Sequence, residues 1–169
     1  HGTPTYFKAF GFRDFAGQIP MDTGAIFELA SVSKQFTSMI IMMLEEKGLL
    51  KYDDSVSTYL PQLPYRGITI RHLLNHTSGL PDYQAVMDKN WDKTKVAGND
   101  DNIAYLSRYR PAAHFQPGAR YEYSNTGYML LASIAEKASG QDFIDLCRSW
   151  IFRPLSLSKT DIRTKTDKL

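Results

Sequence analysis

An apolar helical stripe that follows the stretch "FELASVSKQF", residues 27–36, constrains the fold more than any other feature. Apolar side chains recur there at helical spacing, and Gly48 then gives a stop signal. The stripe comprises Phe36, Met39, Ile40, Met43 and Leu44, with Ile41 and Met42 widening it. We expect a helix that is buried on almost all sides. A lysine, Lys34, stands within its first turn.

Ser31 and Lys34 are three positions apart, so on a helix their side chains leave nearly the same face, about 4.5 Å apart along the axis. A serine hydroxyl is a poor nucleophile unless a base takes its proton. A lysine in apolar surroundings loses part of the solvation that favours its charged form, so it can act as that base. The pair is therefore a candidate nucleophile and base. The alternative is a plain helix start, in which Ser31 caps the helix and Lys34 extends to the surface.

A second polar element is "YEYSN", residues 121–125, which precedes a helix expected from about Thr126 to Gly140. Tyr123 and Asn125 flank Ser124, so a tight turn can present a phenol and a carboxamide on one side. Tyr123 can shuttle protons, and Asn125 can hold a substrate amide or orient Lys34. The alternative is that Tyr123 only packs and Asn125 is the N-cap of the helix.

Composition narrows the class of protein. The 169 residues are 43% hydrophobic, which suits one domain, and 20 basic against 18 acidic residues are scattered without the basic patch of a nucleic-acid-binding protein. The single cysteine, Cys147, excludes a disulfide framework within the chain. The longest apolar run, residues 39–44, is too short to span a bilayer. Because the sequence opens with His1, we expect the natural N-terminus to lie outside it.

The remaining pattern predicts few strands and several short helices. The aromatic run in "TYFKAFGFRD", residues 5–14, predicts a strand. Thr69 is expected to cap a short helix that ends at a Thr-Ser-Gly-Leu-Pro turn, and polar residues 88–102 are expected to form a loop. Helices are also expected at 102–109 and 142–151.

Four quoted segments in this order resemble the serine β-lactamase and penicillin-binding protein family, in the branch of class C β-lactamases, D-aminopeptidases and family VIII carboxylesterases. They are "IFELASVSKQFTSMIIMMLEEKGLLKYDDSVSTYLPQLP", "ITIRHLLNHTSGLPDY", "QPGARYEYSNTGYMLLASIAEKASGQDF" and "IFRPLSLSKT". The resemblance implies an α+β fold, with an antiparallel sheet flanked by helices beside a helical lobe. It also implies that Ser31 is the acylated nucleophile, Lys34 its general base, Tyr123 a second proton-transfer group and Asn125 a substrate-orienting residue. One amide of an oxyanion hole would be that of Ser31.

The family's third motif, Lys-Thr-Gly or His-x-Gly on a strand, has no counterpart here: "SKTD" at 158–161 lacks the glycine, and "TKTDKL" closes the chain. We therefore expect an internal piece of a longer protein, which is mainly the helical part and lacks sheet strands at both ends. It would form a single incomplete domain, with residues 1–30 as a partial sheet segment and 31–169 as the nucleophile helix and helical lobe. Such a piece is expected to be inactive by itself.

Other polar groups offer weaker sites. His72 and His76 are four apart, with His114 as a possible third zinc ligand, but the intervening "LLN" lacks a metalloprotease glutamate and the turn after His76 explains that residue. Asp53 and Asp54 form either a carboxylate dyad or, as their place before Ser55 indicates, a helix cap and solvated face. Loop aromatics border a cleft or only cover the core, namely Tyr65, Tyr83 and Trp91.

The sequence thus predicts a serine hydrolase that forms an acyl-enzyme on an amide or ester carbonyl, in a β-lactam, a D-amino-acid peptide or a short-chain ester. The alternative is a non-catalytic module that binds such ligands, or senses β-lactams, through the same cleft. We expect no cofactor, no metal and no nucleic-acid partner, and a small-molecule or peptide substrate. The resemblance is compatible with a periplasmic or secreted location.

Overall fold

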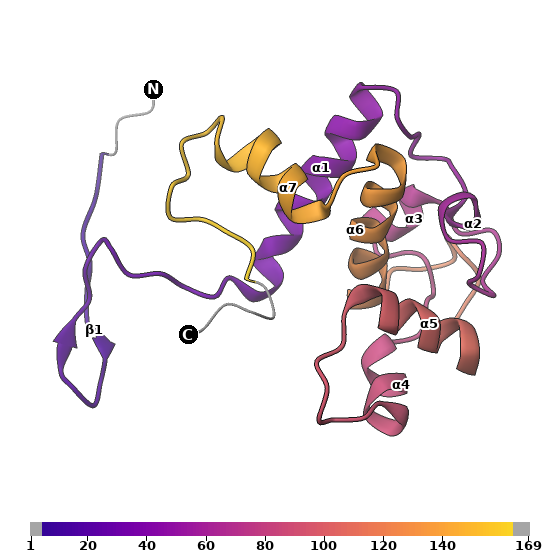
Figure 1. Ribbon diagram of the computed structural model, residues 1–169, viewed down its shortest axis with the longest axis horizontal. Coiled ribbons are helices and arrows are strands. Elements are labelled where there is room, and N and C mark those ends of the chain that lie inside the picture. The colour runs from indigo at the N-terminus through magenta and orange to yellow at the C-terminus, as the bar shows by residue number, and fades with distance from the viewer. Residues whose placement is uncertain (1–4, 164–169) are drawn as a thin grey trace. The chain divides into compact units, whose positions relative to one another are not determined.

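The first of two compact units, His1–Val32, contains a short antiparallel hairpin. The structure, a computed structural model, describes residues 5–163, and the second unit is Ser33–Leu169 (Figure 1). In the hairpin β1 (Phe12–Asp14) pairs with β2 (Ile19–Pro20). The strand predicted in residues 5–14 forms only at its end, because Gly11 has a φ of +79° and interrupts the extended backbone before β1. The expected single incomplete domain, divided at residues 30 and 31, stays a prediction.

The second unit is helical. The 3-10 turn η1 (Ala30–Ser33) joins the two units along the chain and leads directly into α1. The helices that follow are α1 (Lys34–Glu46), α2 (Val56–Tyr59), α3 (Ile70–Leu74), α4 (Tyr83–Asn90), α5 (Asn99–Tyr109), α6 (Asn125–Ser139), α7 (Phe143–Cys147) and the π-helical turn η2 (Arg148–Phe152).

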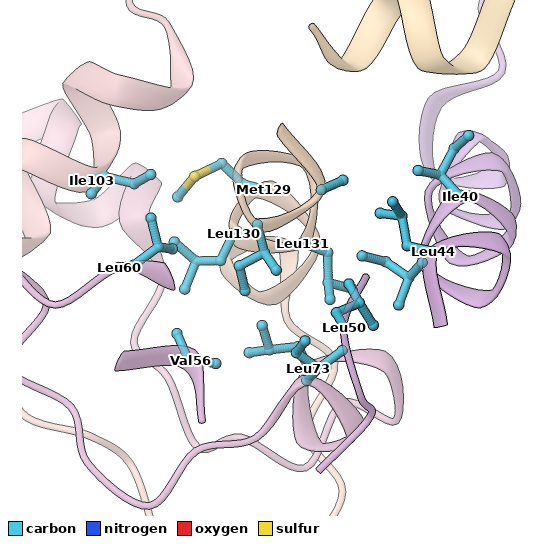
Figure 2. Close-up of a cluster of buried hydrophobic side chains, with 14 of the residues drawn as sticks. Ile40, Leu44, Leu50, Val56, Leu60, Leu73, Ile103, Met129, Leu130 and Leu131 are labelled. Atoms are coloured by element: carbon cyan, nitrogen blue, oxygen red, sulfur yellow. The ribbon is translucent and has the colours of Figure 1, made fainter. Parts of the chain in front are cut away.

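Helix α6 lies at the centre of this unit, where it contacts α1, α2, α3, α5 and α7. Figure 2 shows Leu130 and Leu131 of α6 between Ile40 and Leu44 of α1 on one side and Leu60 and Ile103 on the other. Leu130 and Leu131 have no exposed surface. Burial on this scale favours a single position of the helix, because each large side chain loses packing energy if the helix shifts. The N-terminal end of α6 is therefore fixed relative to α1.

The prediction that α1 is buried on almost all sides is wrong in part. Ile40, Ile41 and Leu44 have no exposed surface, but Met39 and Met42 are 44% and 43% exposed. Figure 2 shows Ile40 and Leu44 on the side of α1 that faces α6. The stripe therefore has one face against α6 and one open face.

The structure corrects one further sequence prediction and rules out one alternative. Residues 88–102 are not one loop, because α4 continues to Asn90 and α5 begins at Asn99, with Asp101 accepting the Gly98 amide as in a capping box. The N-cap of α6 is Ser124, whose hydroxyl accepts the Gly127 amide at 3.1 Å, rather than Asn125. Asn125 is thus free of the capping role that sequence reasoning offered as its alternative. The cap of α3 by Thr69 is confirmed.

Hydrogen bonds pair the turn after α3 with the segment that leads into α6. The backbone oxygens of His76, Thr77 and Gly79 accept the amides of Glu122, Gly118 and His114 respectively, each at 2.8 Å. Gly79 permits the closest approach, because a Cβ built there would lie 2.2 Å from the Phe115 oxygen. The "HTSG" turn therefore fixes the path of the chain just before Tyr123.

Among the residues that the structure describes, none of the helices is both long and apolar enough to cross a membrane.

We predict that Gly79→Ala destabilises the fold more than Gly140→Ala. Both glycines have left-handed backbones, with φ of +69° and +71°, so each alanine carries a conformational cost of about 1–2 kcal/mol. Only at position 79 does the new methyl group overlap backbone, which adds about 1–3 kcal/mol. Urea unfolding of both variants measures the difference. Equal losses of unfolding free energy would contradict the close approach described for Gly79.

Candidate active site

The ammonium of Lys34 and the carboxamide of Asn125 form the centre of the candidate site. Lys34 is the first residue of α1 and Asn125 the first of α6. The Nζ of Lys34 donates to Oδ1 of Asn125 at 2.8 Å in a partly buried setting. The two polar motifs found in the sequence, 91 positions apart, therefore meet through a charge-assisted hydrogen bond. The Lys34 side chain points to Asn125 rather than away into solvent.

Two tyrosines bring their rings to the same ammonium. The Nζ of Lys34 lies 4.9 Å from the ring centroid of Tyr123 and 5.5 Å from that of Tyr128. At these distances the rings attract the cation. The Tyr128 hydroxyl is 3.1 Å from Ser38 Oγ and donates to the Leu74 oxygen at 3.1 Å, so it is held from α1 and from α3. Tyr123 is 47% exposed, which leaves it open to a ligand.

Thr126 anchors the start of α6. Its side chain has no exposed surface. The Thr126 hydroxyl donates to the Pro81 backbone oxygen at 2.7 Å, and the Thr126 hydroxyl oxygen accepts the Tyr83 amide at 2.9 Å. These bonds tie the first turn of α6 to the loop between α3 and α4. Asn125 and Tyr123 are thus supported by a cap, a buried anchor and the paired segment described above.

His76 belongs to this cluster, although sequence reasoning considered it only as a zinc ligand or as part of a turn. Its ring centroid lies 4.7 Å from that of Tyr123 and 5.0 Å from that of Tyr128. Its Nδ1 accepts the Ser124 amide at 3.0 Å. Burial lowers the pKa of His76 below its usual 6.5, and the Lys34 charge lowers it further. A histidine just before a Thr-Ser-Gly turn was the available signal, but its partner 48 positions away was not readable from the sequence.

Ser31, the fourth predicted residue, lies in η1 within the first unit. It stands within one turn of the start of α1, as the sequence predicts. The structure brings together Lys34, Tyr123 and Asn125 within the second unit, and it does not place the Ser31 hydroxyl relative to them.

The three histidines considered as zinc ligands have separate partners. His72 Nδ1 accepts the Thr69 amide at 3.1 Å, His76 binds the Ser124 amide, and His114 pairs with Glu122. Within residues 5–163 no group of three or more His, Cys, Asp or Glu side chains is arranged to hold a metal ion.

The carboxylates of the possible dyad also have different partners. Asp53 forms a bidentate pair with Arg71, at 2.8 and 2.9 Å, which lowers the pKa of Asp53. Asp54 accepts the Tyr59 hydroxyl at 2.8 Å and the Lys51 amide at 2.8 Å. Ser55 caps α2. Each carboxylate thus has a structural partner.

The loop aromatics pack against the core or against each other. The Tyr65 hydroxyl donates to the Pro111 oxygen at 2.9 Å, and burial raises the pKa of Tyr65 to about 12. Tyr83 packs on the core, where burial also raises its pKa. Trp91 lies 5.4 Å from the Tyr105 ring, centroid to centroid.

A cavity between α4 and residues 109–114 is lined in part by Asp82, Lys89 and His114. The cluster around Lys34 does not line this cavity.

Comparison with known proteins gives consistent matches along the chain. A sequence model of the family described as "Beta-lactamase" matches residues 1–168. Penicillin-binding protein 4* of Bacillus subtilis (strain 168) is 47% identical over 161 residues, which cover 95% of this chain and 36% of that protein. A D-aminopeptidase of Cereibacter sphaeroides (strain ATCC 17029) is 30% identical over 161 residues, covering 94% of this chain and 31% of that protein.

Among solved structures, a penicillin-binding protein from Bacillus halodurans matches with a TM-score of 0.81 and 30% sequence identity. The match covers 95% of this chain and 49% of that chain. The chain therefore spans about a third of the length of these two curated relatives and about half of this solved structure.

We predict that Thr126→Val lowers the free energy of unfolding by about 1–3 kcal/mol, because it leaves the Tyr83 amide and the Pro81 oxygen without the hydroxyl that each contacts. The exposed Thr58→Val provides a matched control and should change stability by about 0.5 kcal/mol or less. Denaturant unfolding monitored by circular dichroism measures both. A Thr126→Val variant as stable as the control would mean that this hydroxyl does not anchor α6.

Proposed function

The chain belongs to the beta-lactamase family, and from this premise we propose that its protein is a serine hydrolase that acylates Ser31 with the carbonyl of an amide or an ester. The chain has the beta-lactamase/transpeptidase-like fold, of which its described residues are mostly helical with a two-stranded sheet. The two curated relatives carry the names penicillin-binding protein and D-aminopeptidase. Their chemistry is the starting point for the roles proposed below.

The observation that supports this function most strongly is the hydrogen bond between Lys34 Nζ and Asn125 Oδ1, at 2.8 Å. The lysine begins α1 and the asparagine begins α6, and the packing of these two helices brings their first residues together. Their contact, with the Tyr123 ring beside the ammonium, gathers a base, an amide and a phenol around one point. A base beside a serine and a phenol that exchanges protons are groups that acyl transfer to a serine can use.

We assign the roles as follows. Ser31 Oγ attacks the carbonyl carbon, a new C–O bond forms, and the hydroxyl proton passes to the neutral amine of Lys34. Collapse of the tetrahedral intermediate breaks the bond to the leaving group, which takes a proton from the Tyr123 hydroxyl. The Lys34 ammonium then returns a proton to the Tyr123 phenolate, which restores both groups. A water molecule attacks the acyl carbon and gives a proton to the Lys34 amine. The bond to Ser31 Oγ breaks, and Oγ takes that proton back as the carboxylic acid leaves. Asn125 keeps the Lys34 head in place and offers its amide N–H groups to the substrate.

The start of α1 supports the nucleophile role of Ser31. Ser31 lies in η1, directly before α1, and the first amides of a helix have no intrahelical acceptor. These amides, together with the helix dipole, favour the negative charge that develops on the carbonyl oxygen. We therefore assign the Ser31 amide to one side of an oxyanion hole.

The names of the two curated relatives support β-lactams and D-amino-acid peptides as substrates, and the resemblance of the sequence to family VIII carboxylesterases adds short-chain esters. We propose β-lactams, D-amino-acid peptides and short-chain esters as the compounds to test first. The second candidate function is a binding or sensing module that is acylated once by a β-lactam and does not turn over, which the name of the Bacillus subtilis relative favours. Turnover after acylation separates the two functions.

We predict that the protein expressed from its complete gene reacts with a fluorophosphonate or a β-lactam, and that the added mass maps to the peptide containing Ser31. Ser31→Ala removes the nucleophile and Lys34→Ala removes the base, so each should abolish labelling or nearly so. Intact-mass and peptide mass spectrometry give the readout. Label on another residue would contradict the assignment, and stoichiometric label without release of product would favour the binding module.

We also predict that Tyr123→Phe slows turnover by about 10²–10⁴-fold, the usual contribution of a general acid–base group. The substitution keeps the ring, and therefore its contact with Lys34, and removes only the hydroxyl. Because Tyr123 is 47% exposed, the melting temperature should stay unchanged. Parental turnover by Tyr123→Phe would show that this tyrosine has no proton-transfer role.

A further inference from the structure

The proposed chemistry leaves His76 without a role, although both its ring and its backbone contact the segment that carries Tyr123. Its backbone has a φ of +56°, a conformation that a histidine seldom adopts without a compensating interaction. The compensation is visible. The His76 oxygen accepts the Glu122 amide at 2.8 Å, and the His76 Nδ1 accepts the Ser124 amide at 3.0 Å.

Those two bonds hold the residues on both sides of Tyr123. Glu122 is bound through the backbone of His76 and Ser124 through its ring, so one histidine fixes the backbone that carries the tyrosine. The Ser124 bond also acts on Asn125, the next residue and the first of α6. His76 therefore contacts the chain at the point where both polar side chains of the second motif begin.

The ring of His76 stacks on the same tyrosines as the ammonium of Lys34. Its interplanar angle is 31° with Tyr123 and 32° with Tyr128. Lys34 Nζ lies over both tyrosine rings. The titratable groups that face the imidazole are Lys34 from α1, Tyr121 and Tyr123 from the segment before α6, and Tyr128 from α6.

Protonation of His76 would act against this arrangement in two ways. An imidazolium carries a proton on Nδ1, so the ring would turn a donor toward the Ser124 amide and lose the bond. It would also add a second positive charge next to Lys34. Both effects favour the neutral ring with its proton on Nε2.

We propose that His76 is a positioning residue, whose neutral imidazole holds the Ser124 amide and thereby sets Tyr123 and Asn125 against Lys34. This proposal rests on the proposed function for its catalytic consequence, but its structural content stands separately. The burial and the Lys34 charge that lower the pKa of His76 keep the ring neutral around neutral pH. The site should therefore lose its geometry only as the pH falls through that lowered pKa.

The proposed role predicts that protonation of His76 appears in the pH profile of the Ser31 acylation rate, on its acid side. Below the pKa of His76, the slope of log rate against pH should increase by about one unit, because the imidazole must then lose its proton before the site has its working geometry.

Three variants separate positioning from packing. His76→Asn keeps an acceptor near the place of Nδ1, tolerates the left-handed backbone and does not titrate. His76→Phe keeps an aromatic ring but has no acceptor. The matched control is His72→Asn, because His72 Nδ1 also accepts a backbone amide, that of Thr69 at 3.1 Å, at the opposite end of α3 from His76.

The experiment measures the rate of Ser31 acylation by a fluorophosphonate between pH 4.5 and 8 in the protein expressed from its complete gene. We expect His76→Phe to lose about 10²-fold, as misplaced catalytic groups do, at every pH. His76→Asn should stay much closer to the parental rate and lack the steeper acid slope. His72→Asn should keep the parental slope. A parental rate in His76→Phe, or the steeper slope in His76→Asn, would overturn the proposal.

A second readout does not depend on activity. The backbone ¹⁵N–¹H resonance of Ser124 should shift as His76 titrates, with a midpoint below pH 6.5, and should not titrate in His76→Asn. If Ser31 is never labelled but this resonance titrates as expected, the proposed function fails and the positioning role stands. A Ser124 resonance that is constant through the His76 titration would overturn the positioning role itself.

Discussion

The position of α6 is the constraint on which the rest of the candidate site depends. In its first half, residues 125–132, only Asn125 and Tyr128 are partly exposed and the other residues are buried. The helix packs against five other helices. A helix held in this way transmits its position to its first residue, Asn125. The same packing against α1 brings the first residue of that helix, Lys34, to within hydrogen-bonding distance. The polar contact is thus a consequence of an apolar interface.

The position of the N-terminal end of α6 also depends on the chain segment that precedes it. Segment 114–124 is attached to the "HTSG" turn by a series of backbone bonds, and two residues of that turn, His76 and Gly79, adopt left-handed backbones to make them. Glycine adopts this conformation without cost, but for His76 it carries strain, which persists only where surrounding bonds compensate for it. The bonds that compensate for this strain go to Glu122 and Ser124, so they also hold Tyr123 in place.

Sequence patterns predicted what depends on neighbouring residues. The cap at Thr69 and the end of the α6 helix before Gly140 were both readable, because caps and helix periods are local signals. The roles of Tyr123 and Asn125 stay predictions. The open face of α1 at Met39 and Met42 was not, since periodicity says that a face is apolar and not what covers it. The partner of His76 was also out of reach, because it lies 48 positions away.

An experimental structure of the protein expressed from its complete gene, determined with a fluorophosphonate adduct and without it, tests the central claim most directly. In the free protein we expect Ser31 Oγ within about 2.6–3.2 Å of Lys34 Nζ, with the same ammonium bound to Asn125. In the adduct, phosphorus should be bonded to Ser31 Oγ. A Ser31 hydroxyl directed away from Lys34, or a Lys34 ammonium without its bond to Asn125, would contradict the account.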